Sequence, residues 1–242
     1  MSLVTAKDIT KDYQSGDITV NAIKAVNFNI EPASFVAFVG PSGSGKSTLL
    51  NMIGCLDRPS EGVLTVLDTD VSQLNRHSAA SFRGQHIGFV FQDFNLIPVL
   101  NVYENIEYPL IMVQSWNINQ RRERVMALLD AVGMADQANK LPGQLSGGQK
   151  QRVAVARALV TNAKLVLADE PTANLDHAAA MRVIELMKNM RDQFDTTFIF
   201  STHDPKIMAA AEVTFTLEDG HLYTHEDYQL YPHPTTTGEE HV

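Results

Sequence analysis

Eight consecutive residues have the composition and spacing of a loop that binds phosphate. They fit G-x-x-x-x-G-K-[ST] and are Gly40, Pro41, Ser42, Gly43, Ser44, Gly45, Lys46 and Ser47. Apolar residues 35–39 precede the loop and a helix-like run at 48–53 follows it. Backbone N–H groups and the helix dipole favour phosphate at such a junction. Lys46 should reach the β- and γ-phosphates, Ser47 should hold Mg²⁺, and the adjacent Thr48 should complete the nucleotide contacts.

Two acidic residues end another apolar run. Asp169 and Glu170 follow residues 165–168. A carboxylate at Asp169 can hold Mg²⁺ through water while Ser47 binds the metal directly. Glu170 is placed to polarise a water molecule that attacks the γ-phosphate. The alternative is that both acids only cap the turn that follows, but downstream of a phosphate loop the catalytic interpretation is favoured.

A second motif predicts another anion-binding helix start. Leu145 is followed by Ser146, Gly147, Gly148 and Gln149, and then by a helical pattern through Leu159. A hydroxyl group, backbone N–H groups and the helix dipole together favour a phosphate there. The simpler interpretation is a loop with an N-cap serine. Two phosphate-binding helix starts in one chain suggest that a nucleotide is shared between two sites.

The remaining pattern predicts an α/β protein. Buried strands at 35–39, 87–91, 165–168 and 197–200 alternate with helical segments, which is typical of a mostly parallel sheet. Residues 3–30 and 63–67 should form an antiparallel sheet beside it, with Tyr13 in the loop between its first two strands. Residues 101–160 read as a helical insertion that begins with a capped helix start at Asn101. Asp219 and Gly220 indicate a hairpin turn.

Composition restricts the class of protein. The chain has 242 residues and a net charge of −9, which argues against a nucleic-acid partner. Cys55 is the only cysteine and should be a small buried apolar group. No run approaches the roughly 18 apolar residues of a membrane span, and residues 1–8 have no signal-peptide core. Residues 225–242 read as a polar tail whose three histidines are weak metal-binding candidates.

The motifs occur in the order of the ATP-binding subunits of ABC transporters, which the chain resembles over about residues 3–224. These motifs are the phosphate loop, Gln92, residues 145–149, the acid pair and His203. Several segments resemble in sequence the lipoprotein-release and macrolide-export branch of these proteins. They are residues 39–51, 88–92, 95–98, 104–105, 168–172 and 174–176. The resemblance implies a P-loop ABC ATPase fold over 1–224, with a RecA-like mostly parallel core, an antiparallel β-subdomain and a helical subdomain at about 95–160.

The resemblance also implies roles for single residues. Tyr13 resembles the aromatic residue that stacks on adenine, and Gln92 the residue that contacts Mg²⁺ and the attacking water. Ser146, Gly148 and Gln149 would contact the ATP held by another subunit. Asp176 resembles the residue that couples the two sites, although capping a helix is its alternative role. His203 resembles the histidine that bonds the γ-phosphate.

The expected mechanism is that of a head-to-tail dimer around two ATP molecules that drives an integral-membrane permease. Asp169 and Ser47 would hold Mg²⁺, Glu170 would activate water, and Lys46 and His203 would stabilise transition-state charge. The chain would lie in the cytoplasm, on the inner face of the cell membrane. The main alternative is an ABC ATPase that acts on nucleic acid or the ribosome; an unrelated phosphate-loop kinase or GTPase would leave residues 145–149 unexplained.

The sequence departs from that of the branch in two places. Ala33 and Ser34 stand where the branch commonly has Gly-Glu before the phosphate-loop strand, and Ala173 stands where glycine is usual. Neither departure touches a residue assigned to chemistry, so both leave the expected activity unchanged.

Overall fold

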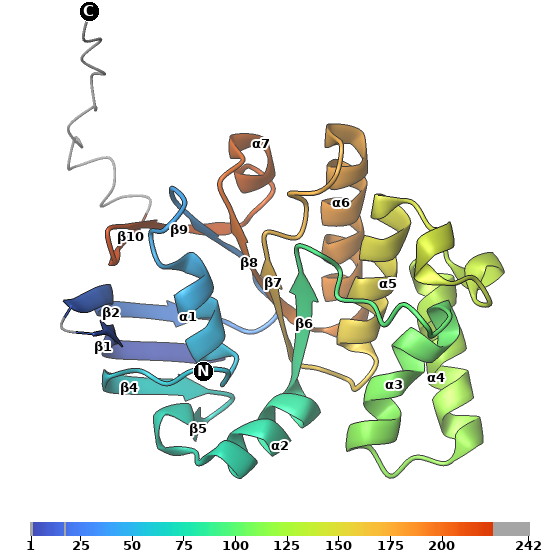
Figure 1. The fold of residues 1–242 in the computed structure, drawn as a ribbon, viewed down its shortest axis with the longest axis horizontal. Helices are drawn as coiled ribbons and strands as arrows, with labels where there is room; N and C mark the ends of the chain where they lie inside the picture. Colours follow the sequence, from blue (N-terminus) through green and yellow to red (C-terminus); the bar gives the residue numbers. More distant parts are fainter. Residues whose placement is uncertain (1, 17, 225–242) are drawn as a thin grey trace, which may run out of the picture.

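A computed structural model describes residues 2–16 and 18–224 and contains a six-stranded sheet with a mostly parallel core (Figure 1). The strand order is β10-β9-β3-β8-β7-β6. The strands are β3 (Phe35–Val39), β6 (Ile87–Phe91), β7 (Leu165–Asp169), β8 (Thr197–Thr202), β9 (Val213–Glu218) and β10 (His221–Thr224). Every neighbouring pair is parallel except β9 and β10. The carboxyl ends of the five parallel strands therefore meet at one edge, as the alternating pattern predicted.

Both faces of this sheet are buried. Phe35, Ala37 and Val39 belong to one apolar cluster, whereas Val36 and Phe38 belong to the other. Successive side chains of a strand point to opposite faces, so β3 supplies both clusters. This explains why the strand is continuously apolar rather than alternating.

A second sheet is antiparallel and packs beside the first, as predicted. Its order is β2-β1-β4-β5, with β1 at Val4–Ser15, β2 at Ile18–Ile30, β4 at Glu61–Val66 and β5 at Thr69–Asp70. The alternation of apolar and polar residues in β2 places one face inside and one outside, as predicted. Val26, Phe28 and Ile30 are buried, while Asn27 and Asn29 are exposed. The expected loop position of Tyr13 was wrong. Tyr13 lies within β1 and pairs with Val20, because the β1–β2 ribbon continues to Ser15 and Ile18.

Seven α-helices occur in the described ranges. They are α1 (Lys46–Ile53), α2 (Arg76–His86), α3 (Val102–Val113), α4 (Ile118–Ala131), α5 (Gly147–Leu159), α6 (His177–Phe194) and α7 (Pro205–Met208). Short 3₁₀ segments occupy Val71–Gln73, Ala135–Gln137 and Pro142–Gln144. In Figure 1, α3 and α4 lie on the side of the core opposite the antiparallel sheet. The division of the chain into subdomains stays a prediction.

The helix starts carry the predicted caps. Asn101 caps α3, where its side chain accepts from the N–H of Glu104 while the Glu104 carboxylate accepts from the N–H of Asn101. Asp176 caps α6, since its carboxylate accepts from the N–H of Ala179 at 2.9 Å. Such side-chain bonds, reciprocal at α3 and single at α6, satisfy N–H groups that a helix start otherwise leaves unpaired.

Other local predictions can be compared directly. The hairpin at Asp219 and Gly220 joins β9 to β10, and both residues have positive φ, as a tight hairpin turn requires. Cys55 is 8% exposed, and burial raises the pKa of its thiol to about 11, which fits a structural role. Within the described part of the chain, no helix has the length and apolar character needed to cross a bilayer. The predicted tail at 225–242 and its histidines lie outside the described residues.

Candidate functional site

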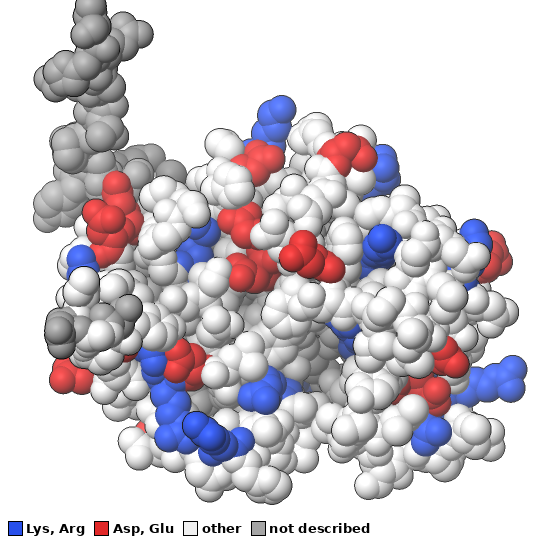
Figure 2. Space-filling view, viewed as in Figure 1, with Lys and Arg blue, Asp and Glu red and all other residues white. Residues whose placement is uncertain are grey.

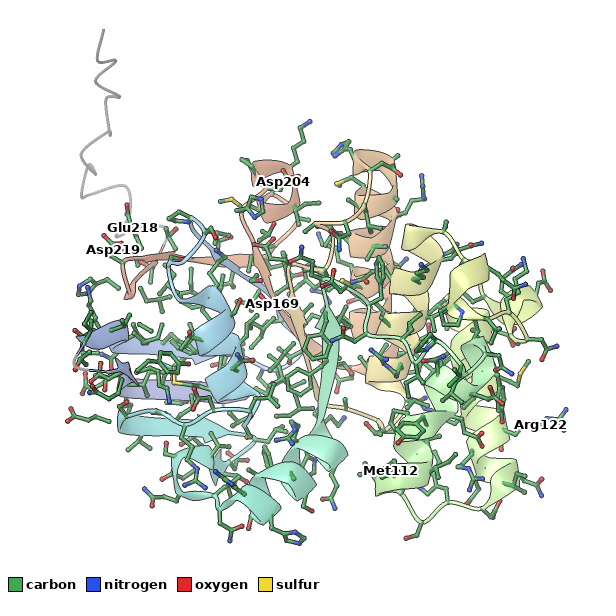
Figure 3. All side chains as sticks on the ribbon, viewed as in Figure 1. Met112, Arg122, Asp169, Asp204, Glu218 and Asp219 are labelled. Atoms are coloured by element: carbon green, nitrogen blue, oxygen red, sulfur yellow. The ribbon has the colours of Figure 1, made fainter. Side chains whose placement is uncertain are left out.

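Four loops meet at the carboxyl edge of the parallel sheet and enclose a cleft of about 400 Å³. They follow β3, β6, β7 and β8, and Asp169, labelled in Figure 3, ends β7. The cleft is lined by Ala22, Ser42, Gly43, Gly45, Lys46, Ser47, Thr48, Gln92, Asp169, Glu170, Ala173 and His203. The structure therefore brings most of the predicted nucleotide, metal and catalytic residues into one cleft. Of the remaining phosphate-loop residues, Ser44 is buried, and its hydroxyl has no hydrogen-bond partner in the described ranges.

Glycine is required at two positions of the loop. Gly40 has φ +149°, and a Cβ there would lie 2.0 Å from the carbonyl oxygen of Leu217. Gly45 has φ +107° and is the N-cap of α1, where a Cβ would lie 2.6 Å from the carbonyl oxygen of Ala22. The loop can pass this close to neighbouring backbone only without side chains. The result is a helix start whose N–H groups are available to an anion.

Lys46 is buried at the base of the loop, at 7% exposure. Its ammonium group donates to the carbonyl oxygens of Gly40 and Pro41, both at 2.8 Å. Burial lowers the pKa of Lys46, while the carboxylates of Glu170 and Asp169 act in the opposite direction. The positively charged side chain of Lys46 therefore lies beneath the loop, and two backbone carbonyl groups of the loop hold its ammonium group in place.

Asp169 accepts two hydroxyl hydrogen bonds. Ser47 donates to its Oδ1 at 3.0 Å, and Ser201 donates to the same oxygen at 2.7 Å. These groups are hard oxygen donors, and Mg²⁺ in nucleotide sites is usually held by one or two carboxylates together with phosphates. In the described part of the chain, no cluster of three His, Cys, Asp or Glu residues could hold a metal alone. The oxygen set at Ser47 and Asp169 thus fits a magnesium ion that arrives with a nucleotide.

Glu170 and His203 form a pair across the cleft. His203 Nδ1 lies 2.9 Å from Glu170 Oε1, and the histidine side chain is 66% exposed while that of glutamate is 18% exposed. Glu170 has φ +45°, so the chain turns sharply after β7 and separates the directions of Asp169 and Glu170. The geometry matches a general base next to a residue that can contact the same substrate.

Ser201 is a site residue that the sequence reasoning missed. It is fully buried at the end of β8, donates to Asp169 and accepts the N–H of Glu170 at 2.8 Å. The hydroxyl group thus holds both acidic residues in place. The available signal was its position two residues before His203, at the carboxyl end of a strand in a parallel sheet.

The loop after β6 is held by residues from two other elements. Asn174 donates to the carbonyl oxygen of Gln92 at 3.2 Å and to the Asp93 carboxylate at 2.9 Å. From α5, the Arg157 guanidinium donates to the carbonyl oxygens of Phe94 and Asn95. The position of Gln92 in the cleft therefore depends on both α5 and the segment before α6. Arg157 and Asn174 are further residues to which sequence reasoning assigned no role in the site, although residues 174–176 contributed to the family resemblance.

The Ser-Gly-Gly helix start lies elsewhere. A hollow of about 700 Å³, called here the signature hollow, is lined by Ala131, Val132, Gly133, Ser146, Gly147, Gly148, Gln149, Arg152, Asn174, Leu175, Asp176, Ala179, Arg182, Val183, Glu185, Leu186 and Asn189. It shares no lining residue with the nucleotide cleft. The Gln149 side chain accepts from the N–H of Ser146 at 2.9 Å, and Ser146 Oγ accepts from the N–H of Gln149 at 3.3 Å. Ser146 and Asp176 therefore share one surface, as helix caps of α5 and α6.

Tyr13 lines neither cavity. Its hydroxyl donates to Asp57 Oδ2 at 2.8 Å, and Lys11 Nζ lies 4.9 Å from the ring centroid. Burial raises the pKa of Tyr13, with a further contribution from Asp57. The residue is 40% exposed, which leaves part of its surface open to a stacking partner. Its relation to adenine stays a prediction.

Comparison with known proteins gives a consistent family. The family model described as ABC transporter matches residues 23–173. The chain is 41% identical to an uncharacterized ABC transporter ATP-binding protein, MJ0796, from Methanocaldococcus jannaschii, over 93% of this chain and 97% of that protein. It is 42% identical to the macrolide export ATP-binding/permease protein MacB of Hyphomonas neptunium, over 91% of this chain. The chain spans about a third of the length of the MacB relatives it matches.

Solved structures show the same fold. A dimeric post-hydrolysis structure of the MJ0796 cassette bound to ADP and Pi has a TM-score of 0.82 and 40% identity, over 91% of this chain and 98% of that chain. The cbiO1 cassette from Clostridium perfringens has a TM-score of 0.83 and 29% identity, over 92% and 87%. The fold and the cleft thus define an ATP-binding cassette. The chain belongs to the ABC transporter family, as the motif order predicted, and is an ATPase domain of that type.

Proposed function

We propose that this chain is the ATP-hydrolysing motor of an ABC transporter and that each of its active sites is completed by a second copy. The observation that carries the proposal is the separation of two anion-binding helix starts. Lys46 lies at the first, in the cleft, and Ser146 lies at the second, in a hollow that shares no residue with that cleft. A single copy therefore carries both halves of the site, but on two different surfaces.

Within the cleft, each residue has a distinct task. Glu170 orients and deprotonates the attacking water, and His203, 2.9 Å from it, bonds the γ-phosphate. Lys46 stabilises the negative charge that develops on the transferred phosphoryl group. Gln92 contacts the attacking water. Because Gln92 belongs to the loop that Asn174 and Arg157 hold, a change in the cleft is transmitted to that loop. Tyr13, which lies outside the cleft, stacks on the adenine ring.

Ser47 and Asp169 would hold Mg²⁺, with Gln92 as a further contact. This assignment of the metal site is supported by the Ser47 hydroxyl oxygen and the Asp169 carboxylate oxygen, which lie 3.0 Å apart at the end of β7. When bound, the ion would neutralise part of the negative charge on the phosphate groups. Ser201 keeps the Asp169 carboxylate oriented toward that position through its 2.7 Å hydrogen bond.

Two copies would bind head to tail around two ATP molecules. Ser146, Gly147, Gly148 and Gln149 of one copy approach the γ-phosphate and ribose bound by the other, and Asp176 couples the two sites. The dimeric structures described for the MJ0796 cassette support this arrangement. Closure depends on contacts with the γ-phosphate, so hydrolysis releases the two copies.

The membrane-embedded partner would dock beside the helical region. A groove of about 420 Å³ runs between α2, β6, α3 and α5 and includes Phe91 and Arg157, which border the loop that carries Gln92. On α3 next to it, Ile111 and Met112 are 54% and 65% exposed, and Figure 3 labels Met112 at the outer end of α3. Exposed apolar residues beside a groove are typical of a protein interface. The chain would therefore lie on the inner face of the cell membrane.

Export or extraction of a lipoprotein, drug or peptide is the transport task that we favour. The relatives named macrolide export proteins support this choice. The alternative is an ABC ATPase that acts on nucleic acid or the ribosome. Co-purification separates the two, since a membrane-embedded partner supports the transporter and bound nucleic acid supports the alternative.

Glu170→Gln tests the catalytic assignment. The substitution keeps the size of the side chain and removes the base, so turnover should fall by about 10²–10⁴-fold. ATP binding should persist, and an ATP-dependent dimer should accumulate because hydrolysis no longer opens it. Steady-state ATPase assays and sedimentation velocity measure both effects. A Glu170→Gln protein that hydrolyses ATP at the normal rate would disprove the role of Glu170 as the base.

A further inference from the structure

A surface hollow apart from both sites described above has three arginines in its wall. Its volume is about 590 Å³, and it is lined by Cys55, Leu56, Asp57, Arg58, Val71, Arg76, Ala79 and Arg83. None of these residues lines the nucleotide cleft or the signature hollow. In Figure 2, Lys and Arg side chains gather at the lower left, over β5 and α2. The hollow, called here the arginine hollow, is thus a local basic surface on a chain of net charge −9.

Helix α2 is built to present two of these arginines together. Arg76, Ala79 and Arg83 follow the i, i+3, i+7 spacing of one helix face. All three residues line the hollow, and the small side chain of Ala79 stands between the two arginines on this face. Arg76 is also the first residue of the helix, where the dipole favours a bound anion.

The third arginine comes from the turn after α1, and Arg83 is fixed to the same turn. Arg83 Nη1 donates to the carbonyl oxygen of Cys55 at 2.9 Å. A guanidinium group has five N–H donors, so this bond orients Arg83 and leaves most of its donors for another partner. Arg58 lies three residues further along the turn, and both Arg58 and Arg76 are exposed.

Among the described residues, no carboxylate forms a salt bridge with these arginines. Asp57 is the only acid among the described residues of the wall, and its carboxylate oxygens accept from Lys11, from the Tyr13 hydroxyl and from the N–H of Arg58. Between residues 2–16 and 18–224, neither Arg58 nor Arg76 forms a salt bridge. Three guanidinium groups around one hollow repel one another unless an anion lies between them.

We propose that the arginine hollow binds a phosphate group. The planar fork of a guanidinium matches phosphate oxygens, and several such groups together suit a phosphate better than a single carboxylate. Two sources share this chemistry: the headgroup of an anionic phospholipid and a soluble phosphate ester. Leu56, 48% exposed on the wall, offers an apolar contact to a lipid. Arg83 also lines the groove proposed for the membrane partner, so the lipid source rests on that part of the proposed function.

Vesicle co-sedimentation tests the lipid source. The full chain is mixed with vesicles of phosphatidylcholine alone and with vesicles that contain about a third phosphatidylglycerol. The chain should partition onto the anionic vesicles, and each basic residue near such a surface contributes about fivefold. Arg58→Gln/Arg76→Gln should therefore weaken binding by about 25-fold, and added salt should weaken the binding of the original chain.

Arg122→Gln is the matched control. Arg122 lies on α4, on the opposite side of the molecule in Figure 3, and its substitution removes one positive charge from an exposed side chain, as each of the two substitutions in the hollow does. Its removal should leave vesicle binding unchanged. ATP hydrolysis should stay at its original rate in both variants, because Arg58, Arg76 and Arg122 all lie outside the cleft. A loss of lipid binding is therefore separable from a failure of the proposed ATPase mechanism.

Inorganic phosphate tests the soluble source. The side-chain Nε–H signals of Arg58, Arg76 and Arg83, each assigned from its single Gln variant, report this hollow and exclude phosphate bound at the loop around Lys46. Phosphate-dependent shifts of these signals without preference for anionic vesicles would support a site for a soluble ester. Absence of both responses, or equal weakening by Arg122→Gln, would overturn the proposal.

Discussion

Ala33 has a backbone conformation that glycine adopts more readily. It stands where the related branch commonly has glycine, and its φ is +56°. A left-handed backbone conformation costs an L-residue roughly 1–2 kcal/mol, and glycine avoids this cost. Glycine also has greater conformational freedom in the unfolded chain, which offsets part of that gain in stability. Ala33→Gly should therefore raise the free energy of unfolding by about 0.5–1 kcal/mol, measured by urea denaturation.

Ala173 provides the matched comparison at the residue scale. It also replaces a usual glycine, but it is not among the described residues with positive φ. Ala173→Gly should lower the free energy of unfolding by about 0.5–1 kcal/mol, since only the unfolded chain gains freedom. If both variants change stability in the same direction, the conformational explanation for Ala33 is wrong.

Ser201 links the two acidic residues and has no access to water. Ser201→Ala removes the hydroxyl that donates to Asp169 and accepts from the N–H of Glu170. A buried group left without its partner costs about 1–3 kcal/mol, so the midpoint of urea unfolding should fall accordingly. ATP turnover should fall as well, because the orientation of both carboxylates changes. Ser34→Ala, which removes an exposed bond to the Glu31 carbonyl, should change neither quantity appreciably.

At the scale of elements, the sequence predicts those whose burial leaves a periodic pattern. The four apolar strands of the core, the alternating β2 and the capped starts of α3, α5 and α6 were all predicted, because each is determined by neighbours in the chain. Tyr13 was misplaced for the opposite reason. Residues 12–14 are exposed, so that end of the β1–β2 ribbon has no buried face and no alternation to detect.

Contacts between distant elements were not predictable in this way. Ser201 lies 32 residues from Asp169, and Arg157 lies 63 residues from Phe94. Their roles follow from which strands and helices become neighbours, and no local spacing encodes that choice. A resemblance to a family can transfer the motif residues, whereas Ser201, Asn174 and Arg157 became visible only through their hydrogen bonds.

The connection between α5 and the loop after β6 can be tested by Arg157→Lys. Lysine keeps the charge but cannot make the forked contact with the carbonyl oxygens of Phe94 and Asn95. ATP turnover should fall by about tenfold while ATP affinity stays within about twofold, since Gln92 loses its position but the phosphate loop is intact. Hydrogen exchange at residues 92–96 should accelerate.

Arg152→Lys is the control for this element. It lies on the same helix, and its guanidinium donates to the carbonyl oxygens of Val132 and Gly133 instead of the loop. Exchange at residues 92–96 should be unchanged in this variant. Faster exchange in both variants would show that α5 as a whole, rather than Arg157, holds the loop.

At the scale of the whole molecule, the arrangement of cavities determines what one copy can do. The cleft holds the proposed base Glu170, a buried lysine and oxygen donors, so the proposed phosphate and magnesium contacts all lie within a single chain. The Ser-Gly-Gly helix start, proposed as the second anion site, faces a different hollow, so the same chain cannot deliver it to its own cleft without rearrangement. ATP binding and dimer formation should therefore be separable by substitution.

Ser146→Arg in the Glu170→Gln background tests this separation. A large cation at the start of α5 should block the surface that meets the second copy, so ATP-dependent dimerisation, followed by sedimentation velocity, should weaken by at least about 100-fold. ATP affinity of the monomer should stay within about twofold, because Ser146 lies outside the cleft. Ser115→Arg, an exposed change in the loop before α4, should leave the dimer intact. If Ser146→Arg instead weakens monomer binding as much as Lys46→Ala does, the serine acts within its own chain, and the shared site has to be rejected.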